Sequence, residues 1–293
     1  MRELTVAALQ MACGPSRPEN LERMERLVRE AAGAGARVVV PQELFADRYF
    51  CKDERPRDFD LAEELSASVV VRRFAALARE LGVVIPISFF ERAGQSYFNS
   101  VAVADADGSL LGLYRKSHIP DGPGYEEKYY FSPGDTGFAA FATAAGTIGV
   151  GICWDQWFPE CARALALLGA EVLCYPTAIG SEPRDPGYDT SPHWRRVMQG
   201  HAAANMVPVV ASNRVGEEVG DPTVLTFYGT SFIADGTGAV VAELDRVSES
   251  FVTATFDRDE LVEARAGFGL FRDRRPDLYG ALVTRDGLLH QPS

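Results

Sequence analysis

The chain is poor in the residues that bind metals and form disulfides. Its 293 residues include only four histidines, and its five cysteines are odd in number. No two cysteines have the Cys-x-x-Cys spacing of a zinc or redox site. The cysteines lie within apolar segments, at Cys13, Cys51, Cys153, Cys161 and Cys174. We therefore expect a reduced, cytoplasmic protein with no disulfide framework and no bound metal.

Cationic side chains and long apolar runs are also scarce. The 29 lysines and arginines are outnumbered by 41 acidic residues, which gives a formal net charge of −12. This charge disfavours binding to a phosphate backbone, so no nucleic acid partner is expected, and it mildly favours a cationic small substrate. No run of eighteen apolar residues occurs, so no membrane partner is expected either. The apolar stretch from Leu4 to Cys13 contains Gln10 and predicts a buried strand rather than a signal peptide.

Apolar periodicity alternates between strand and helix along the chain. A helix opening at Pro18 and a second one ending at Gly82 each carry apolar residues at spacings of three and four. A third helix has Pro159 in its first turn and ends before Gly169, a fourth begins at Ser191, and a fifth begins at Asp257 or Asp259. Strands are expected at 4–11, 37–41, 83–90, 97–104, 109–116, 147–152, 171–175, 207–213, 225–234, 238–244 and 248–256. This pattern predicts one α/β domain over residues 1–293, with an irregular tail from about residue 267.

Cys153 lies where an apolar strand, 147–152, meets the opening of a helix, 154–160. A thiol at such a turn stands above the sheet, beside unpaired backbone N–H groups that favour a thiolate and can bind an oxyanion. The backbone N–H of Trp154 is the expected oxyanion donor. The alternative is a buried cysteine that serves as a small apolar residue, as we expect for Cys161 and Cys174.

Two further residues stand at equivalent positions. Glu43 follows the strand at 37–41 among aromatic residues, and Lys116 ends the strand at 109–116. Loops beyond the carboxyl ends of strands in an α/β sheet converge on one crevice, so these two residues and Cys153 are expected to meet there. A carboxylate base, a cation and a thiol nucleophile are what cysteine-dependent cleavage of an amide-like bond requires.

The three segments resemble the nitrilase superfamily of carbon-nitrogen hydrolases. The family's Glu-Lys-Cys triad is matched, in order, by Pro41-Gln42-Glu43-Leu44-Phe45, Tyr114-Arg115-Lys116-Ser117-His118 and Gly151-Ile152-Cys153-Trp154-Asp155. The resemblance extends over about residues 4 to 280. It implies a four-layer αββα sandwich, a covalent thio-acyl intermediate, no metal or organic cofactor, and a homo-oligomer of two or more subunits. It also assigns Glu127 to the catalytic set, although on its own Glu127 reads as a solvated loop acid.

A finer resemblance points to one branch of this superfamily. It is carried by segments 116–125, 153–160 and 175–183, together with His193-Trp194, Gln199-Gly200-His201 and 211–214. It implies hydrolysis of N-carbamoylputrescine to putrescine, ammonia and carbon dioxide, a step of polyamine biosynthesis.

The far end of such a substrate is an ammonium group, which requires a carboxylate. Glu182 is the first candidate because it lies in the loop after the strand that follows Cys153, and Asp155 and Asp121 are weaker ones. A structural role in the loop is equally open for Glu182. Further candidates for contacting the substrate are Tyr49, Tyr130 and Ala178, although aromatic residues near a motif are more often core.

Three other functions remain open from the sequence. The first is an amidase of the same superfamily acting on another ureido or amide compound, such as β-ureidopropionate. The second is a non-catalytic binding protein with this fold, which would be expected to have lost Glu43, Lys116 or Cys153. The third, a metal-dependent hydrolase, lacks a cluster of ligands at suitable spacing. His118 and His201 are expected to be structural.

Overall fold

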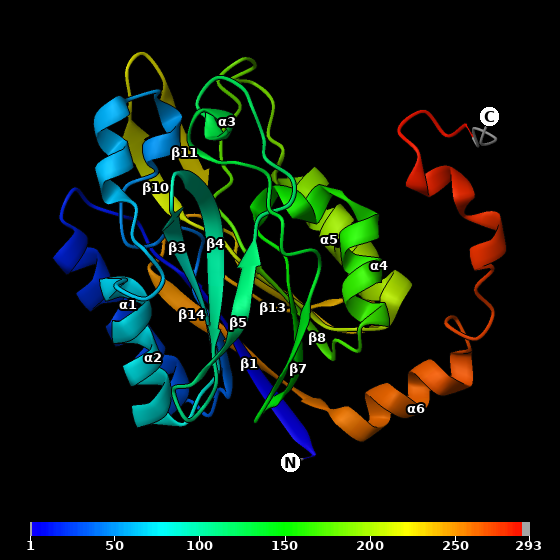
Figure 1. Ribbon diagram of the computed structural model, residues 1–293. Helices are drawn as coiled ribbons and strands as arrows, with labels where there is room; N and C mark the ends of the chain where they lie inside the picture. The colour runs from blue at the N-terminus through cyan, green and yellow to red at the C-terminus, as the bar shows by residue number, and fades with distance from the viewer. Residues whose placement is uncertain (1, 289–293) are drawn as a thin grey trace.

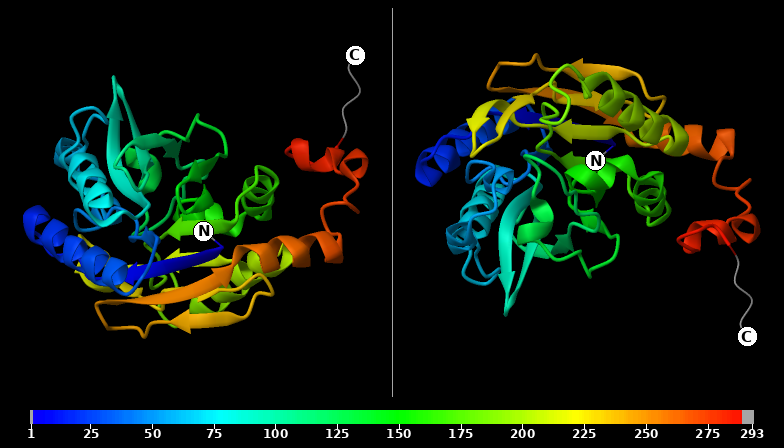
Figure 2. Two further views of the ribbon diagram at one scale, coloured as in Figure 1. Left: turned by 90° about the horizontal axis from the view of Figure 1, so that it is seen from below. Right: turned by 90° about the horizontal axis from the view of Figure 1, so that it is seen from above.

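Two β-sheets pack face to face between two layers of helices. The computed structural model describes residues 2–288. Helices α1 (Arg17–Gly33) and α2 (Val69–Leu81) cover one side, and α4 (Pro159–Leu167) and α5 (Ser191–Asn205) cover the other. Figures 1 and 2 show these layers from three directions. The expected αββα sandwich is confirmed.

The first sheet lies against α1 and α2. Its strands are β14 (Ser250–Asp257), β1 (Glu3–Gln10), β2 (Val38–Val40), β3 (Ile85–Ala93), β4 (Ser96–Ala104) and β5 (Leu110–Arg115). A parallel bridge between Val38 and Val84 joins β2 to the β3–β4–β5 meander. Alternation along β1 shows why this strand is apolar throughout: Leu4 and Val6 face the other sheet, whereas Ala7 and Leu9 face the helices.

The second sheet lies against α4 and α5. In spatial order its strands are β13 (Val240–Glu243), β12 (Phe232–Ala234), β9 (Val209–Ser212), β8 (Val172–Pro176), β7 (Gly146–Val150) and β6 (Ala140–Thr143). An apolar layer that includes Val40, Val101, Val150 and Ile152 fills the space between the two sheets. The parallel strands β7, β8 and β9 direct their carboxyl ends, and the loops that follow them, toward one edge.

Three local features differ from the expected elements. The strand expected over 225–234 is divided into β11 (Val224–Tyr228) and β12, because Gly229 and Thr230 both adopt left-handed backbone angles, with φ of 56° and 54°. β11 pairs instead with β10 (Val215–Val219), a strand that the sequence pattern did not indicate. Residues 117–136, where the sequence pattern indicated neither helix nor strand, contain a short helix, α3 (Glu127–Tyr130).

The C-terminal part of the described chain stands apart from the layers. Helix α6 (Arg258–Phe268) contains no buried residue, and two 3-10 turns, Pro276–Leu278 and Gly280–Val283, follow it. Figures 1 and 2 show α6 and this tail, in orange and red, extending away from the sandwich. Within residues 2–288 no helix has the length and apolarity needed to cross a membrane.

Candidate active site

Four chemically active side chains meet at one end of the sandwich. Glu43 follows β2 and Lys116 follows β5, both in the first sheet, whereas Cys153 follows β7 in the second. Glu127 opens the short helix α3. All four side chains are buried. The convergence expected for Glu43, Lys116 and Cys153 is therefore what the fold provides, and Glu127 is a buried residue rather than a solvated loop acid.

Lys116 lies between the two carboxylates. Its Nζ is 2.9 Å from Glu43 Oε1 and 2.6 Å from Glu127 Oε2. Burial alone would lower the pKa of Lys116, but the charges of Glu127 and Glu43 raise it well above its ordinary value, so the ammonium is retained. An ammonium has three N–H donors, and two of them are used here. The third remains for an oxyanion.

The two carboxylate oxygens of Glu43 differ in their contacts, because only Oε1 takes part in hydrogen bonds or ion pairs with the described residues. Its Oε1 also accepts a 2.7 Å hydrogen bond from Asn99 Nδ2 on β4. Its Oε2 is buried and has no hydrogen-bond partner among residues 2–288. A buried carboxylate oxygen without a donor is unfavourable unless a proton comes to it. Glu43 is therefore arranged to accept a proton, and the thiol of Cys153 is near enough for the charge of Glu43 to act on its pKa.

Cys153 is the first residue of a 3-10 helix, Cys153–Trp157, and has a left-handed φ of 39°. Its Sγ donates to the carbonyl oxygen of Ala178 at 3.7 Å. Burial and the nearby charge of Glu43 raise the pKa of the thiol well above its ordinary value, and the opposing effect of Lys116 is smaller. The resting group is therefore a protonated thiol, which corrects the expectation that the turn would favour a thiolate.

Asp155 holds the Cys153 turn to the Lys116 loop. Its Oδ2 accepts from the backbone N–H of Ile152 at 2.9 Å and from the hydroxyl of Tyr114 at 2.7 Å. Its Oδ1 lies 2.7 Å from Nδ1 of His118 and accepts from the backbone N–H of the same residue at 3.0 Å. Because these donors surround the buried carboxylate, Asp155 ties the two segments together, and it does not line the pocket at Cys153, where a substrate contact was expected.

A pocket of about 330 Å³ opens onto the thiol. Its lining includes Cys153, Glu127, Trp154, Ala178 and Glu182. Trp154 occupies the second position of the 3-10 helix, where the backbone N–H has no partner within the helix. Burial raises the pKa of Glu182, and none of the ion pairs among the described residues involves it. The pocket therefore has a nucleophile at one end and an unneutralised carboxylate on its wall.

Two aromatic residues expected in the pocket lie elsewhere. The hydroxyl of Tyr49 donates to Glu127 Oε1 at 2.7 Å, behind the lysine. The hydroxyl of Tyr130 donates to the carbonyl oxygen of Asp53 at 2.6 Å, and its ring packs edge-on against Phe50. Each buried phenol has a hydrogen-bond partner inside the protein, and neither Tyr49 nor Tyr130 lines the pocket at Cys153. Direct contact of these two residues with substrate stays a prediction.

Several residues of the pocket and of the Glu43 surroundings were not among the predicted site residues. Trp157, His193 and Tyr125 line the pocket, and the rings of Trp157 and His193 are 4.9 Å apart. Asn99, which fixes Glu43, lies in the middle of a strand. Trp157, His193 and Tyr125 belong to segments that carry the finer resemblance, but nothing in the sequence assigned them to the pocket, and Asn99 lies outside every motif.

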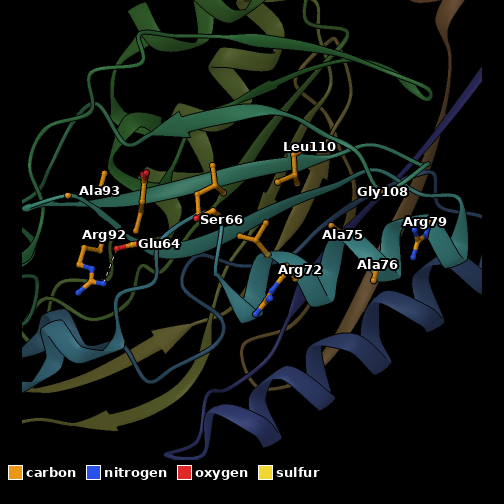
Figure 3. A pocket seen from close by; sticks show the side chains of 14 residues that line it. Glu64, Ser66, Arg72, Ala75, Ala76, Arg79, Arg92, Ala93, Gly108 and Leu110 are labelled. Atoms are coloured by element: carbon orange, nitrogen blue, oxygen red, sulfur yellow. Dashed lines mark hydrogen bonds and ion pairs between the residues drawn. The ribbon is translucent and has the colours of Figure 1, made fainter.

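A second hollow of about 790 Å³ lies between α2 and the β3–β4 hairpin. Figure 3 shows Arg72 and Arg79 along α2 and the ion pair between Arg92 and Glu64, 3.0 Å long, across the rim. The residues that line it include no cysteine, histidine or lysine. It is larger than the pocket at Cys153 but offers no thiol, and no histidine or lysine stands beside Ser66 in its lining, so size does not identify the site here.

The protonation of Glu127 predicts how stability depends on pH. Burial and the nearby charge of Glu43 raise its pKa from 4.5 to about 7, against the opposing effect of Lys116. Because the folded state binds this proton more tightly than the unfolded chain, its contribution is complete below pH 4.5 and is lost as pH rises through 7. Urea unfolding of the parent and of Glu127→Gln between pH 4.5 and 8 should show the parent losing up to about 3 kcal/mol relative to the variant. Parallel curves for the two proteins would contradict this assignment.

A buried thiol, a lysine that bridges two carboxylates and a four-layer α/β sandwich together match the pattern expected for a hydrolase of carbon-nitrogen bonds. Residues 5–266 match the family described as carbon-nitrogen hydrolase, and the chain belongs to this family, within the nitrilase superfamily.

Relatives of known function and structure are similar over nearly the full length. The chain is 57% identical to the N-carbamoylputrescine amidase of Arabidopsis thaliana over 292 residues. The aligned region covers 98% of each protein. It is 52% identical over 285 residues to the citrullinase of Francisella tularensis, covering 97% of this chain and all of that protein. A crystal structure of a carbon-nitrogen hydrolase from Helicobacter pylori G27 superposes with a TM-score of 0.90 at 39% identity, covering 97% of this chain and 99% of that one.

Proposed function

We propose that this enzyme hydrolyses N-carbamoylputrescine to putrescine, ammonia and carbon dioxide, and so acts in polyamine biosynthesis. The observation that carries the proposal is the carboxylate of Glu182 in the same pocket as Cys153, without a basic partner among the described residues. The substrate has a ureido group for the thiol and an ammonium at the far end of an apolar chain. The similarity to plant N-carbamoylputrescine amidases supports the same substrate.

The reaction begins with a proton transfer. The free Oε2 of Glu43 takes the thiol proton as the sulfur attacks the ureido carbon. A C–S bond forms, and the carbonyl electron pair moves to oxygen. The third N–H of Lys116 and the backbone N–H of Trp154 stabilise this oxyanion. A ureido carbonyl is a weak electrophile because two nitrogens donate into it, so two donors at the oxyanion are appropriate.

The second half of the reaction releases the acyl group. The tetrahedral adduct collapses, the C–N bond breaks, and Glu43 returns its proton to the departing nitrogen. Water then loses a proton to Glu43 and attacks the thioester, and the sulfur leaves and regains a proton. The carbamic acid so formed breaks down to carbon dioxide and the remaining amine. Glu127 and Tyr49 keep Lys116 in place throughout, through the contacts of 2.6 and 2.7 Å.

Glu182 is proposed to bind the distal ammonium, with Asp121 near the same opening. Changing Glu182 to Gln keeps the shape and removes the charge. We expect KM for N-carbamoylputrescine to rise about 10- to 100-fold, consistent with loss of a partly buried charge-assisted contact, with kcat changed much less. Butylurea, which lacks the ammonium, provides the matched neutral substrate. An equal change in KM for both compounds would remove Glu182 from the amine site.

A substrate panel tests the function itself. Ammonia release is measured with N-carbamoylputrescine, citrulline, N-carbamoyl-β-alanine and a simple aliphatic amide. Citrulline is the second candidate because Arg184 lines the same pocket and offers a cation for a carboxylate, and because a citrullinase is among the relatives. Glu182 and Asp121 outnumber Arg184, so we expect the highest kcat/KM with N-carbamoylputrescine. No ammonia from this compound would overturn the proposal.

We also propose that the enzyme is a cytoplasmic homo-oligomer. All five cysteines are free thiols, which suits a reducing compartment. The tail leaves large apolar side chains in solvent, with Phe268 70% and Val283 85% exposed, and the end of α4 exposes Leu167 and Leu168. Apolar surface of this kind favours association between subunits. Sedimentation velocity of the full chain tests the assembly.

A further inference from the structure

A buried ion pair lies beside the turn that carries Glu43 and outside the lining of the pocket at Cys153. Arg214, which precedes β10, and Glu218, within it, are joined by a 2.7 Å contact between Nη1 and Oε1. Both side chains are almost completely buried, and neither lines the pocket at Cys153. A buried pair of this kind stabilises a fold only weakly relative to apolar residues of the same size. Its contacts therefore need another explanation.

The guanidinium of Arg214 donates hydrogen bonds to the backbone of the turn that carries Glu43. Its Nη2 donates to the carbonyl oxygens of Glu43 at 3.2 Å and Leu44 at 2.9 Å, and its Nη1 donates to that of Asp47 at 3.0 Å. Leu44 has a left-handed φ of 49°, a conformation that costs a non-glycine residue about 1–2 kcal/mol. The turn is thus held in a strained shape by a fork of donors, and this shape directs the Glu43 side chain toward Lys116.

Glu218, the other member of the ion pair, is linked to Glu127 through Tyr49. Glu218 Oε2 accepts from the backbone N–H of Tyr49 at 2.8 Å. Lys52 Nζ donates to the carbonyl oxygen of Tyr49 at 3.0 Å and lies 3.5 Å from Oε2 of Glu218. The hydroxyl of Tyr49 in turn donates to Glu127. The backbone of Tyr49 is therefore fixed on both sides by charged groups, and its side chain transmits that position to Glu127.

From these contacts we infer that the Arg214–Glu218 pair positions both carboxylates that flank Lys116. Arg214 fixes the position of Glu43 through hydrogen bonds to the backbone of the turn that carries Glu43. Glu218 fixes the position of Glu127 through Tyr49. Neither residue lines the pocket at Cys153, so both act as positioning residues. The inference rests on the catalytic role proposed for Glu43 but not on the identity of the substrate.

Two variants separate positioning from simple stability. Arg214→Lys keeps the charge but cannot supply the fork of donors, and Glu218→Gln keeps the shape but removes the charge. Displacing a catalytic group by about 1 Å can cost about 100-fold, so we expect kcat to fall about 10- to 100-fold while KM stays within about threefold. Glu171→Gln is the matched control, because Glu171 also pairs with an arginine, Arg258, through two contacts of 2.9 Å, away from the site.

Alkylation of Cys153 by iodoacetamide, followed by peptide mapping, gives a readout that needs no substrate. We expect it to slow about tenfold in both variants because the base no longer meets the thiol. If the parent enzyme does not hydrolyse N-carbamoylputrescine but the variants show this slowing, the substrate proposal fails and the positioning role stands. Folded variants with kcat and alkylation rates within twofold of the parent would overturn the inference. The inference would also be overturned if Glu171→Gln lost as much Tm and as much kcat as the two variants, or if neither variant folded.

Discussion

Replacing Cys153 with alanine should reduce hydrolysis by about 10⁴-fold or more, because every covalent step passes through its sulfur. The substitution removes one buried atom from a side chain that is 5% exposed, so the fold and the Tm should change little. Ammonia release at high enzyme concentration measures the residual rate. Mass spectrometry of the parent during turnover should detect an adduct on the peptide that contains Cys153, and the variant should show none.

The other buried cysteines supply the control for this experiment. Cys161 and Cys174 lie in apolar clusters, and burial raises the pKa of each thiol. Changing either to alanine should cost about 1 kcal/mol of stability and leave kcat within about twofold. Turnover by Cys153→Ala at a rate near that of the parent would refute the thiol mechanism.

Changing Lys116 to methionine should abolish activity and also destabilise the protein. Methionine fills a similar volume, but Glu43 and Glu127 would then lie buried together without a cation. Removing one partner of a buried ion pair typically costs about 3–5 kcal/mol. Urea unfolding at pH 8, above the pKa of about 7 that Glu127 has in the parent, should show the largest loss. We expect kcat to fall by about 10³-fold, because the oxyanion also loses a donor.

The double variant Lys116→Met, Glu127→Gln separates these two effects. It leaves a single buried carboxylate, so repulsion between the two acids is removed. Its free energy of unfolding should exceed that of Lys116→Met, while its kcat should stay as low. Recovery of activity together with stability would mean that Lys116 has only a structural role. Equal stability of the two variants would contradict the charge balance described for this cluster.

The layered fold was predictable because its apolar patterns are long and consistent. The apolar face of α1, from Leu21 to Ala31, and the buried strand β1 appear in the structure at the expected positions. The interrupted strand at Gly229 and Thr230 was not predictable, since its residues are apolar or β-branched on both sides of the break. Its ending depends on two backbone angles that tertiary packing imposes.

The reactive side chains were also predictable, but their supports were not. Glu43, Lys116 and Cys153 each follow a strand, and that placement is visible in the sequence. Asn99, Asp155 and Arg214 act through contacts with residues more than thirty positions away, and local patterns carry no sign of such contacts. Tyr130 shows the converse: it stands beside a motif in sequence, yet its hydroxyl turns to a carbonyl on another segment.

The thiol and its base are attached to different sheets. Cys153 follows β7, Glu43 follows β2, and the apolar layer containing Val40, Val150 and Ile152 separates the two strands. The thickness of this layer therefore sets how far the sulfur stands from the oxygen that takes its proton. A change of one methylene in the middle of the molecule can alter that separation while each sheet keeps its own hydrogen bonds. The interior packing of this enzyme is thus a determinant of its rate as well as of its stability.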